Sequence, residues 1–214
     1  LFFFSGFHFL PGSLAAYGSL LHKQKPREVI LWMLEHAADA DLRAYVMGYL
    51  CHYAMDRTVH PLVEAYAEKL AAGRHEPKGI LHVWLESTLD VYTLKDIRRY
   101  DVYKKIVLSK AEAEKLAAFY QLLFLEIFHL HLPLAALMKA PHEMAQNLRL
   151  LAPNETKYKA LLRLESALHK PHFLSSMMLN GKEDCPMLNL EHAPYPDPIA
   201  KTAFFSYPQL YEKS

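Results

Sequence analysis

The chain has 214 residues, 52% of them apolar and 22% charged, which excludes the intrinsically disordered and collagen-like classes and predicts one substantial core. Its formal net charge is +1, so no charge excess points to nucleic acid or to an anionic membrane surface. The chain has 13 histidines against two cysteines. This ratio favours metal binding or acid–base chemistry, because histidine is the commonest metal ligand and titrates near neutral pH.

The N-terminal stretch LFFFSGFHFL is apolar but too short to span a membrane, and no basic region precedes it. The sequence starts without Met, so we expect residue 1 to be an internal position of a longer chain. Cys51 and Cys185 are far apart and form no CxxC pair, so the sequence predicts neither a disulfide framework nor a thiolate zinc site. Export and oligomeric state are left open.

Helical periodicity dominates the rest of the sequence. Pro26 suits the first turn of one helix, and Ser109 suits the N-cap of the most strongly apolar one. The predicted helices are residues 26–38, 41–59, about 78–94, 109–131, 134–150 and 154–169. Strand patterns are scarce, so we predict an all-α, single-domain, multi-helix bundle over residues 1–214. Residues 181–214 are proline-spaced and rich in aromatics, and they predict an irregular tail packed on the bundle.

The stretch GYLCHYAMDRTVHP places His52, Asp56 and His60 at intervals of four. On a helix each such step turns the side chain by only about 40°, so the three share one stripe. Their surroundings are apolar, and a buried carboxylate is costly unless it is paired or binds a cation. An arginine, Arg43 or Arg57, is the alternative partner for Asp56, with both histidines bonded to backbone carbonyls.

The stripe continues through Glu64 and Glu68, which with Lys69 are interpreted as the solvated end of the helix. A second apolar helix, ILHVWLESTLD, repeats the spacing with His82, Glu86 and Asp90.

If the two stripes face one another, they bring three imidazoles and two or three carboxylates together. Such a ligand set suits Zn²⁺, with Mn²⁺ or Fe as competitors. Two or more ions would be needed to neutralise these carboxylates. A pair of ions about 3.5–4 Å apart is the usual clamp for phosphate-ester hydrolysis.

These motifs resemble a known family. HYAMDRTVHP resembles the HxxxD…HP element of the zinc-dependent phospholipase C family, which shares its fold with P1-type nucleases, and HVWLE resembles its HxxxE element. The stretch LFFFSGFHFLPGSLAAYGSLLH resembles the segment ahead of these helices, which ends in a metal-binding histidine. The resemblance covers roughly residues 1–95, and LNLEHAPYPDP is similar to the tail of some bacterial members.

The resemblance implies two groups of zinc ligands. The first group is His22, His52 and Asp56. The second group is His60, His82 and Glu86. Asp90 would orient a ligand imidazole from outside the coordination shell. Family members take further ligands, including those of a third zinc, from residues that would precede Leu1, so we expect two or three ions.

The implied activity is zinc-dependent hydrolysis of a phosphodiester by metal-bound water, with phospholipid head groups as the first substrate class. Alternatives are a P1-like nuclease or small phosphoesterase, and a non-catalytic helical module with a reduced or structural metal site. We expect a small-molecule or phospholipid substrate, no stable nucleic-acid complex and no transmembrane segment. Glu126 and His129 form an ExxH, the spacing of di-iron bundles, but the sequence offers no convincing second copy.

Overall fold

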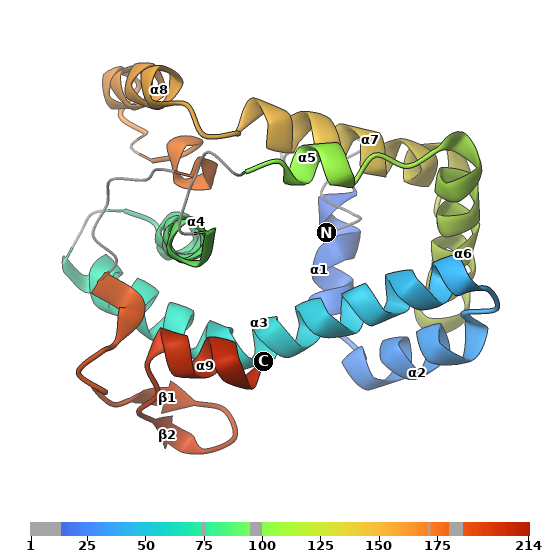
Figure 1. Ribbon diagram of the computed structural model, residues 1–214, viewed down its shortest axis with the longest axis horizontal. Coiled ribbons are helices and arrows are strands. Elements are labelled where there is room, and N and C mark those ends of the chain that lie inside the picture. The colour runs from blue at the N-terminus through green and yellow to red at the C-terminus, as the bar shows by residue number, and fades with distance from the viewer. Residues whose placement is uncertain (1–13, 74–75, 95–99, 171, 180–185) are drawn as a thin grey trace. The chain divides into compact units, whose positions relative to one another are not determined.

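The computed structural model describes residues 14–73, 76–94, 100–170, 172–179 and 186–214, and these are mostly helical (Figure 1). The helices are α1 (Ala15–Lys23), α2 (Pro26–His36), α3 (Ala40–Gly73), α4 (Lys78–Leu94), α5 (Val102–Lys105), α6 (Lys110–Phe128), α7 (Leu134–Leu150), α8 (Glu155–Ala167) and α9 (Tyr207–Lys213). The 3₁₀ turns are η2 (Ser175–Met177) and η3 (Pro186–Leu188), and the strands are β1 (Tyr195–Asp197) and β2 (Lys201–Ala203). The predicted all-α class is confirmed. No described helix combines the length and apolar character needed to cross a bilayer.

The chain forms two compact units. Unit 1 comprises Leu1–Leu50 and Asp101–Leu150, and unit 2 comprises Cys51–Tyr100 and Leu151–Ser214. Helix α3 therefore contributes its first part to unit 1 and its second part to unit 2. The single-domain organisation stays a prediction.

Unit 1 is built around α6, which packs against α2 and α7. Ser109 begins α6 as predicted, because its hydroxyl accepts from the Glu112 amide while the Glu112 carboxylate accepts from the Ser109 amide. His129 ends the helix in the left-handed conformation, with φ of 57°. Glu126 accepts a hydrogen bond of 2.6 Å from the indole Nε1 of Trp32 on α2. Of the two ExxH residues, His129 therefore caps the end of α6, and Glu126 links α6 to α2.

Unit 2 has a separate core beneath one face of α3. Its buried apolar residues are Val59, Leu62, Val63, Ala67, Trp84, Leu85, Leu89, Met187, Tyr195, Ala203, Tyr207 and Leu210. The prediction of an irregular tail is wrong for much of residues 186–214. These residues form an antiparallel β1–β2 hairpin and α9. Tyr195 pairs with Ala203 in this hairpin, and both side chains point into the core. Residues 180–185 lie outside the described part of the chain.

Helix α3 is longer than predicted. The predicted helix covers residues 41–59. Pro61 follows, and proline lacks an amide proton and disrupts helix interiors. The helix instead continues through Pro61 to Gly73. Buried Leu62, Val63 and Ala67 follow the proline at helical spacing, so packing against the core outweighs its local cost. The extension adds further turns to α3 beyond His60.

Candidate metal centre

The candidate centre lies in unit 2, where α3 and α4 cross. In Figure 1 α4 is seen nearly along its axis while α3 runs across the view, so the two helices cross steeply. His60 comes from α3, and His82 and Glu86 lie one turn apart on α4. Helical spacing puts the α4 pair on one face, and Leu81 and Leu85, each 0% exposed, anchor that helix from its buried side. The crossing brings the three polar side chains together.

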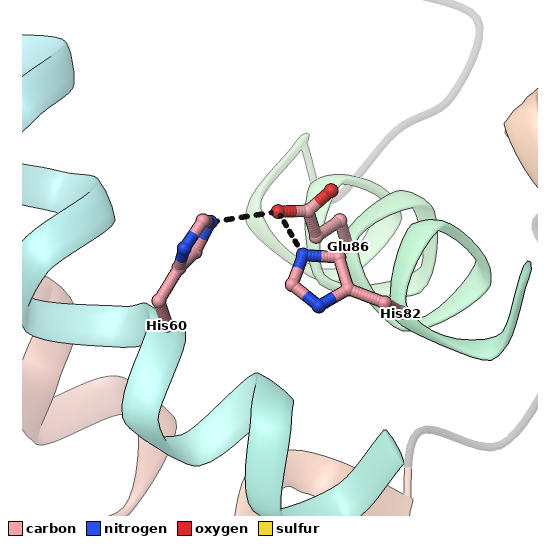
Figure 2. Close-up of side chains that lie close together, drawn as sticks. All are labelled: His60, His82 and Glu86. Carbon is pink, nitrogen blue, oxygen red and sulfur yellow. Dashed lines mark hydrogen bonds and ion pairs between the residues drawn. The ribbon is translucent and has the colours of Figure 1, made fainter. Parts of the chain in front are cut away.

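The three side chains converge on one carboxylate oxygen (Figure 2). His60 Nε2 lies 3.0 Å from Glu86 Oε1, and His82 Nε2 lies 3.2 Å from the same oxygen. The two imidazole rings meet edge to face, with centroids 5.1 Å apart. The three potential ligand atoms all lie within 4.8 Å of one another, and no second group of three metal-ligating residues meets this criterion in the described part of the chain.

These separations suit a metal ion. Zinc bonds of about 2.0–2.2 Å in tetrahedral geometry place neighbouring ligand atoms about 3.3–3.6 Å apart. The two nitrogen–oxygen distances, 3.0 and 3.2 Å, require only a small adjustment to reach that spacing. Two imidazoles and one carboxylate also form a donor set that zinc accepts in catalytic sites. The residues present therefore fit a divalent ion.

Two members of the first predicted ligand group, His52 and Asp56, lie beside this centre. His52 Nε2 is 3.4 Å from Asp56 Oδ2, and Asp56 Oδ1 is 3.6 Å from His60 Nε2. Asp56 thus lies between two histidines of its own helix, as the stripe predicts. The side chains of His52 and Asp56 are 30% and 22% exposed, so they are half-buried rather than enclosed. His60 joins the two groups, because it approaches both Asp56 and Glu86.

His22, the remaining predicted ligand, lies in α1 and belongs to unit 1. Its side chain is outside the described residues. Its assignment to the first zinc therefore stays a prediction.

Glu64 has a role that the sequence interpretation missed. It was assigned to the solvated end of α3, but its Oε1 lies 2.9 Å from Nδ1 of His82. Its other oxygen is 2.6 Å from Nζ of Lys78, the first residue of α4, and Lys78 also lies 2.7 Å from Glu68. The signal was the unbroken spacing of four from His60 to Glu64.

Asp90, predicted to orient a ligand imidazole, is exposed on α4 one turn beyond Glu86. Partial desolvation by the surrounding protein and the negative charge of Glu86 raise the pKa of Asp90. The described contact to a ligand imidazole from outside the centre comes from Glu64. The orienting role of Asp90 stays a prediction.

The charges of the centre are strongly coupled. Burial acts to raise the pKa of Glu86, but hydrogen bonds from His60 and His82 outweigh it and hold the value at about 2. The same hydrogen bonds raise the pKa of both histidines. Burial lowers the pKa of His52 despite the charge of Asp56. Glu86 is therefore ionised, and His60 and His82 bind protons at the positions where a cation would be held.

Comparison of the chain with models of protein families, with curated protein sequences and with solved structures gave no match. Function is therefore inferred from the residues of the centre and their contacts.

Proposed function

We propose that the chain is a metal-dependent phosphodiester hydrolase whose ion is held by His60, His82 and Glu86. The observation that carries the proposal is the convergence of both imidazole Nε2 atoms on one ionised carboxylate oxygen. Zinc is the first choice of ion, because the donors are nitrogen and oxygen atoms in a three-residue set. His52 and Asp56, next to His60, are the residues for a second ion.

Exposure of the centre supports a catalytic rather than a purely structural ion. Structural zinc sites are closed by four protein ligands, whereas catalytic sites keep a position for water or substrate. The group here has three members, and the side chains of His60 and Glu86 are 41% and 42% exposed. A phosphate oxygen can therefore reach the ligand atoms from solvent.

Each protein group has a distinct task in this proposal. Glu86 supplies negative charge to the ion, and His60 and His82 supply neutral nitrogen donors once their protons leave. A bound divalent ion would lower the pKa of a water molecule and stabilise the charge that develops on phosphoryl oxygens. Asp56 adds a second carboxylate, 3.6 Å from the Nε2 atom of His60.

The substrate class rests on the resemblance to the zinc-dependent phospholipase C family. HYAMDRTVHP and HVWLE supply the convergent ligands of this centre, which supports the resemblance, and the same motifs lead us to propose a fold of the phospholipase C/P1 nuclease type. Phospholipid head groups are therefore the first substrate to test, and single-stranded nucleic acid is the second.

Metal content and hydrolysis test the proposal together. Purified protein, dialysed against zinc-free buffer, should retain about one zinc or more per chain, as measured by mass spectrometry. His60→Ala and His82→Ala should lose that zinc, whereas His142→Ala, which changes an exposed histidine of α7 in unit 1, should retain it. Dispersed phosphatidylcholine, single-stranded DNA and bis(4-nitrophenyl) phosphate should then be compared as substrates.

The outcomes separate the candidate functions. Zinc-dependent release of phosphocholine that is lost in His82→Ala supports the phospholipase assignment. Cleavage of DNA alone supports the nuclease. Bound zinc without hydrolysis of any of the three substrates contradicts the enzyme proposal and leaves a helical module with a structural metal.

A further inference from the structure

The His82 imidazole has a carboxylate oxygen at each ring nitrogen. Nε2 lies 3.2 Å from Glu86 Oε1 within the centre, and Nδ1 lies 2.9 Å from Glu64 Oε1. Figure 2 shows the second ring nitrogen directed away from Glu86. The His82 side chain is only 18% exposed, less than half the exposed fraction of His60. Its ring is therefore fixed on both sides.

Glu64 is itself held in place by Lys78. One turn separates Glu64 from Glu68 on α3, and one turn separates Lys78 from His82 on α4. The Lys78 ammonium lies 2.6 Å from Glu64 Oε2 and 2.7 Å from Glu68 Oε1, so it offsets the repulsion between these two carboxylates. With Oε2 engaged by Lys78, Glu64 presents Oε1 to His82.

The arrangement determines which nitrogen of His82 can bind a metal. A neutral imidazole carries one proton, and its other nitrogen is the acceptor or ligand. When a metal displaces the proton on Nε2, the carboxylate at Nδ1 retains the proton there, and the Nε2 lone pair faces His60 and Glu86. Carboxylates in this position fix the tautomer and raise ligand basicity, and their loss typically weakens metal affinity by about 10–100-fold.

We propose that Glu64, held by Lys78, is a positioning residue that keeps the proton of His82 on Nδ1 and thereby sets the metal affinity of the centre. The inference rests on the proposed function in one respect, namely that His82 is a metal ligand.

Glu64→Ala and Glu68→Ala form a matched pair for the test. Both substitutions remove a carboxylate of α3 that binds Lys78, but only Glu64 also contacts His82. The zinc dissociation constant, measured by competition with a chromogenic chelator, should rise about 10–100-fold in Glu64→Ala. It should change less than about twofold in Glu68→Ala, because an exposed ion pair contributes little.

A second measurement separates positioning from general support of the fold. In ¹⁵N-labelled protein loaded with zinc, the His82 resonances should report a proton on Nδ1 and the metal on Nε2. Glu64→Gln keeps an oxygen that can accept the Nδ1 proton, so it should recover part of the affinity lost in Glu64→Ala. If Glu64→Ala does not fold, the same comparison is made between Glu64→Gln, expected to weaken binding modestly, and Glu68→Gln, expected to match the wild type.

The results distinguish this inference from the proposed function. Equal zinc affinity in the Glu64 and Glu68 variants, or coordination of zinc through Nδ1 of His82, would overturn the positioning role while leaving the metal centre intact. A wild-type chain that binds no zinc would overturn both.

Discussion

Replacing His82 by alanine should abolish the stabilisation of unit 2 by zinc. His82 is one of three converging ligands, and its loss leaves His60 and Glu86 without a third donor. A ligand that binds only the folded state stabilises it in proportion to the logarithm of its free concentration relative to the dissociation constant. The thermal shift caused by zinc therefore reports directly on whether these side chains bind it.

The size of the effect follows from the length of the chain. Zinc at 100 times its dissociation constant stabilises the folded state by about 2.7 kcal/mol. For chains of about 150–250 residues, each kcal/mol raises the melting temperature by about 2–4 °C. With 214 residues, the wild-type chain should show a rise of about 5–10 °C. His82→Ala should show less than about 1 °C at the same zinc concentration.

Tryptophan fluorescence can follow unit 2 by itself. The two tryptophans lie in different units, Trp32 on α2 in unit 1 and Trp84 on α4 in unit 2. In a Trp32→Phe background the remaining indole, buried in the core beneath α3, reports on the unit that holds the centre. Melting curves with zinc and with a chelator then give the shift for the wild-type centre, for His82→Ala and for the surface control His142→Ala.

A shift of equal size in His82→Ala and in the wild-type centre would refute the reasoning, because zinc would then bind elsewhere. Loss of the shift in His142→Ala would refute it as well, since that histidine lies in the other unit.

Three further predictions concern pH and stability. In chelator-treated protein, hydrogen bonds to Glu86 raise the pKa of both centre histidines, so their stabilisation is complete below about pH 6.5 and is lost as the pH rises through the raised values. The free energy of unfolding of the wild type, relative to Glu86→Ala, should therefore fall as the pH rises above about 6.5. Zinc should reverse that sign because its ligands must lose protons. Glu165→Ala should lower the free energy of unfolding, measured by urea denaturation, by about 1–3 kcal/mol. The Glu165 carboxylate, in a residue only 4% exposed, accepts hydrogen bonds from the amide and the hydroxyl of Ser175. A change near zero would contradict that pairing. Ser109→Ala should cost about 1 kcal/mol through loss of the α6 cap, against almost none for Lys110→Ala, as measured by thermal denaturation.

The spacing of the polar residues was sufficient to predict the centre but not its surroundings. An interval of four puts His82 and Glu86 on one face of α4, and His60 in one stripe with its neighbours on α3, by helical geometry alone. Their mutual contact also requires the two stripes to face one another, as they do in the structure. The role of Glu64 depends on where α4 crosses α3, and that is decided by tertiary packing. Local patterns carry no information about a crossing point, so Glu64 was assigned to the solvated end of its helix.

Helix positions followed the sequence closely where caps and apolar periodicity agreed. Residues 134–150 form α7 with the bounds that we predicted. The C-terminal hairpin was missed because its prolines resemble breakers. In the structure, Asp197 accepts from the amides of Ile199 and Ala200, and this side-chain turn closes the hairpin between two three-residue strands. Strands this short give no alternation for a sequence interpretation to detect.

The discontinuity of unit 2 has a consequence for biosynthesis. Residues 51–100 of unit 2 are synthesised first, and residues 101–150, which belong to unit 1, follow. Synthesis of unit 2 resumes only at Leu151. Side chains that close the core beneath α3, among them Tyr207 and Leu210, emerge from the ribosome well after α3 and α4. The apolar surface of α3 and α4 therefore stays uncovered until those residues are made. We expect chaperones to bind this surface during that interval.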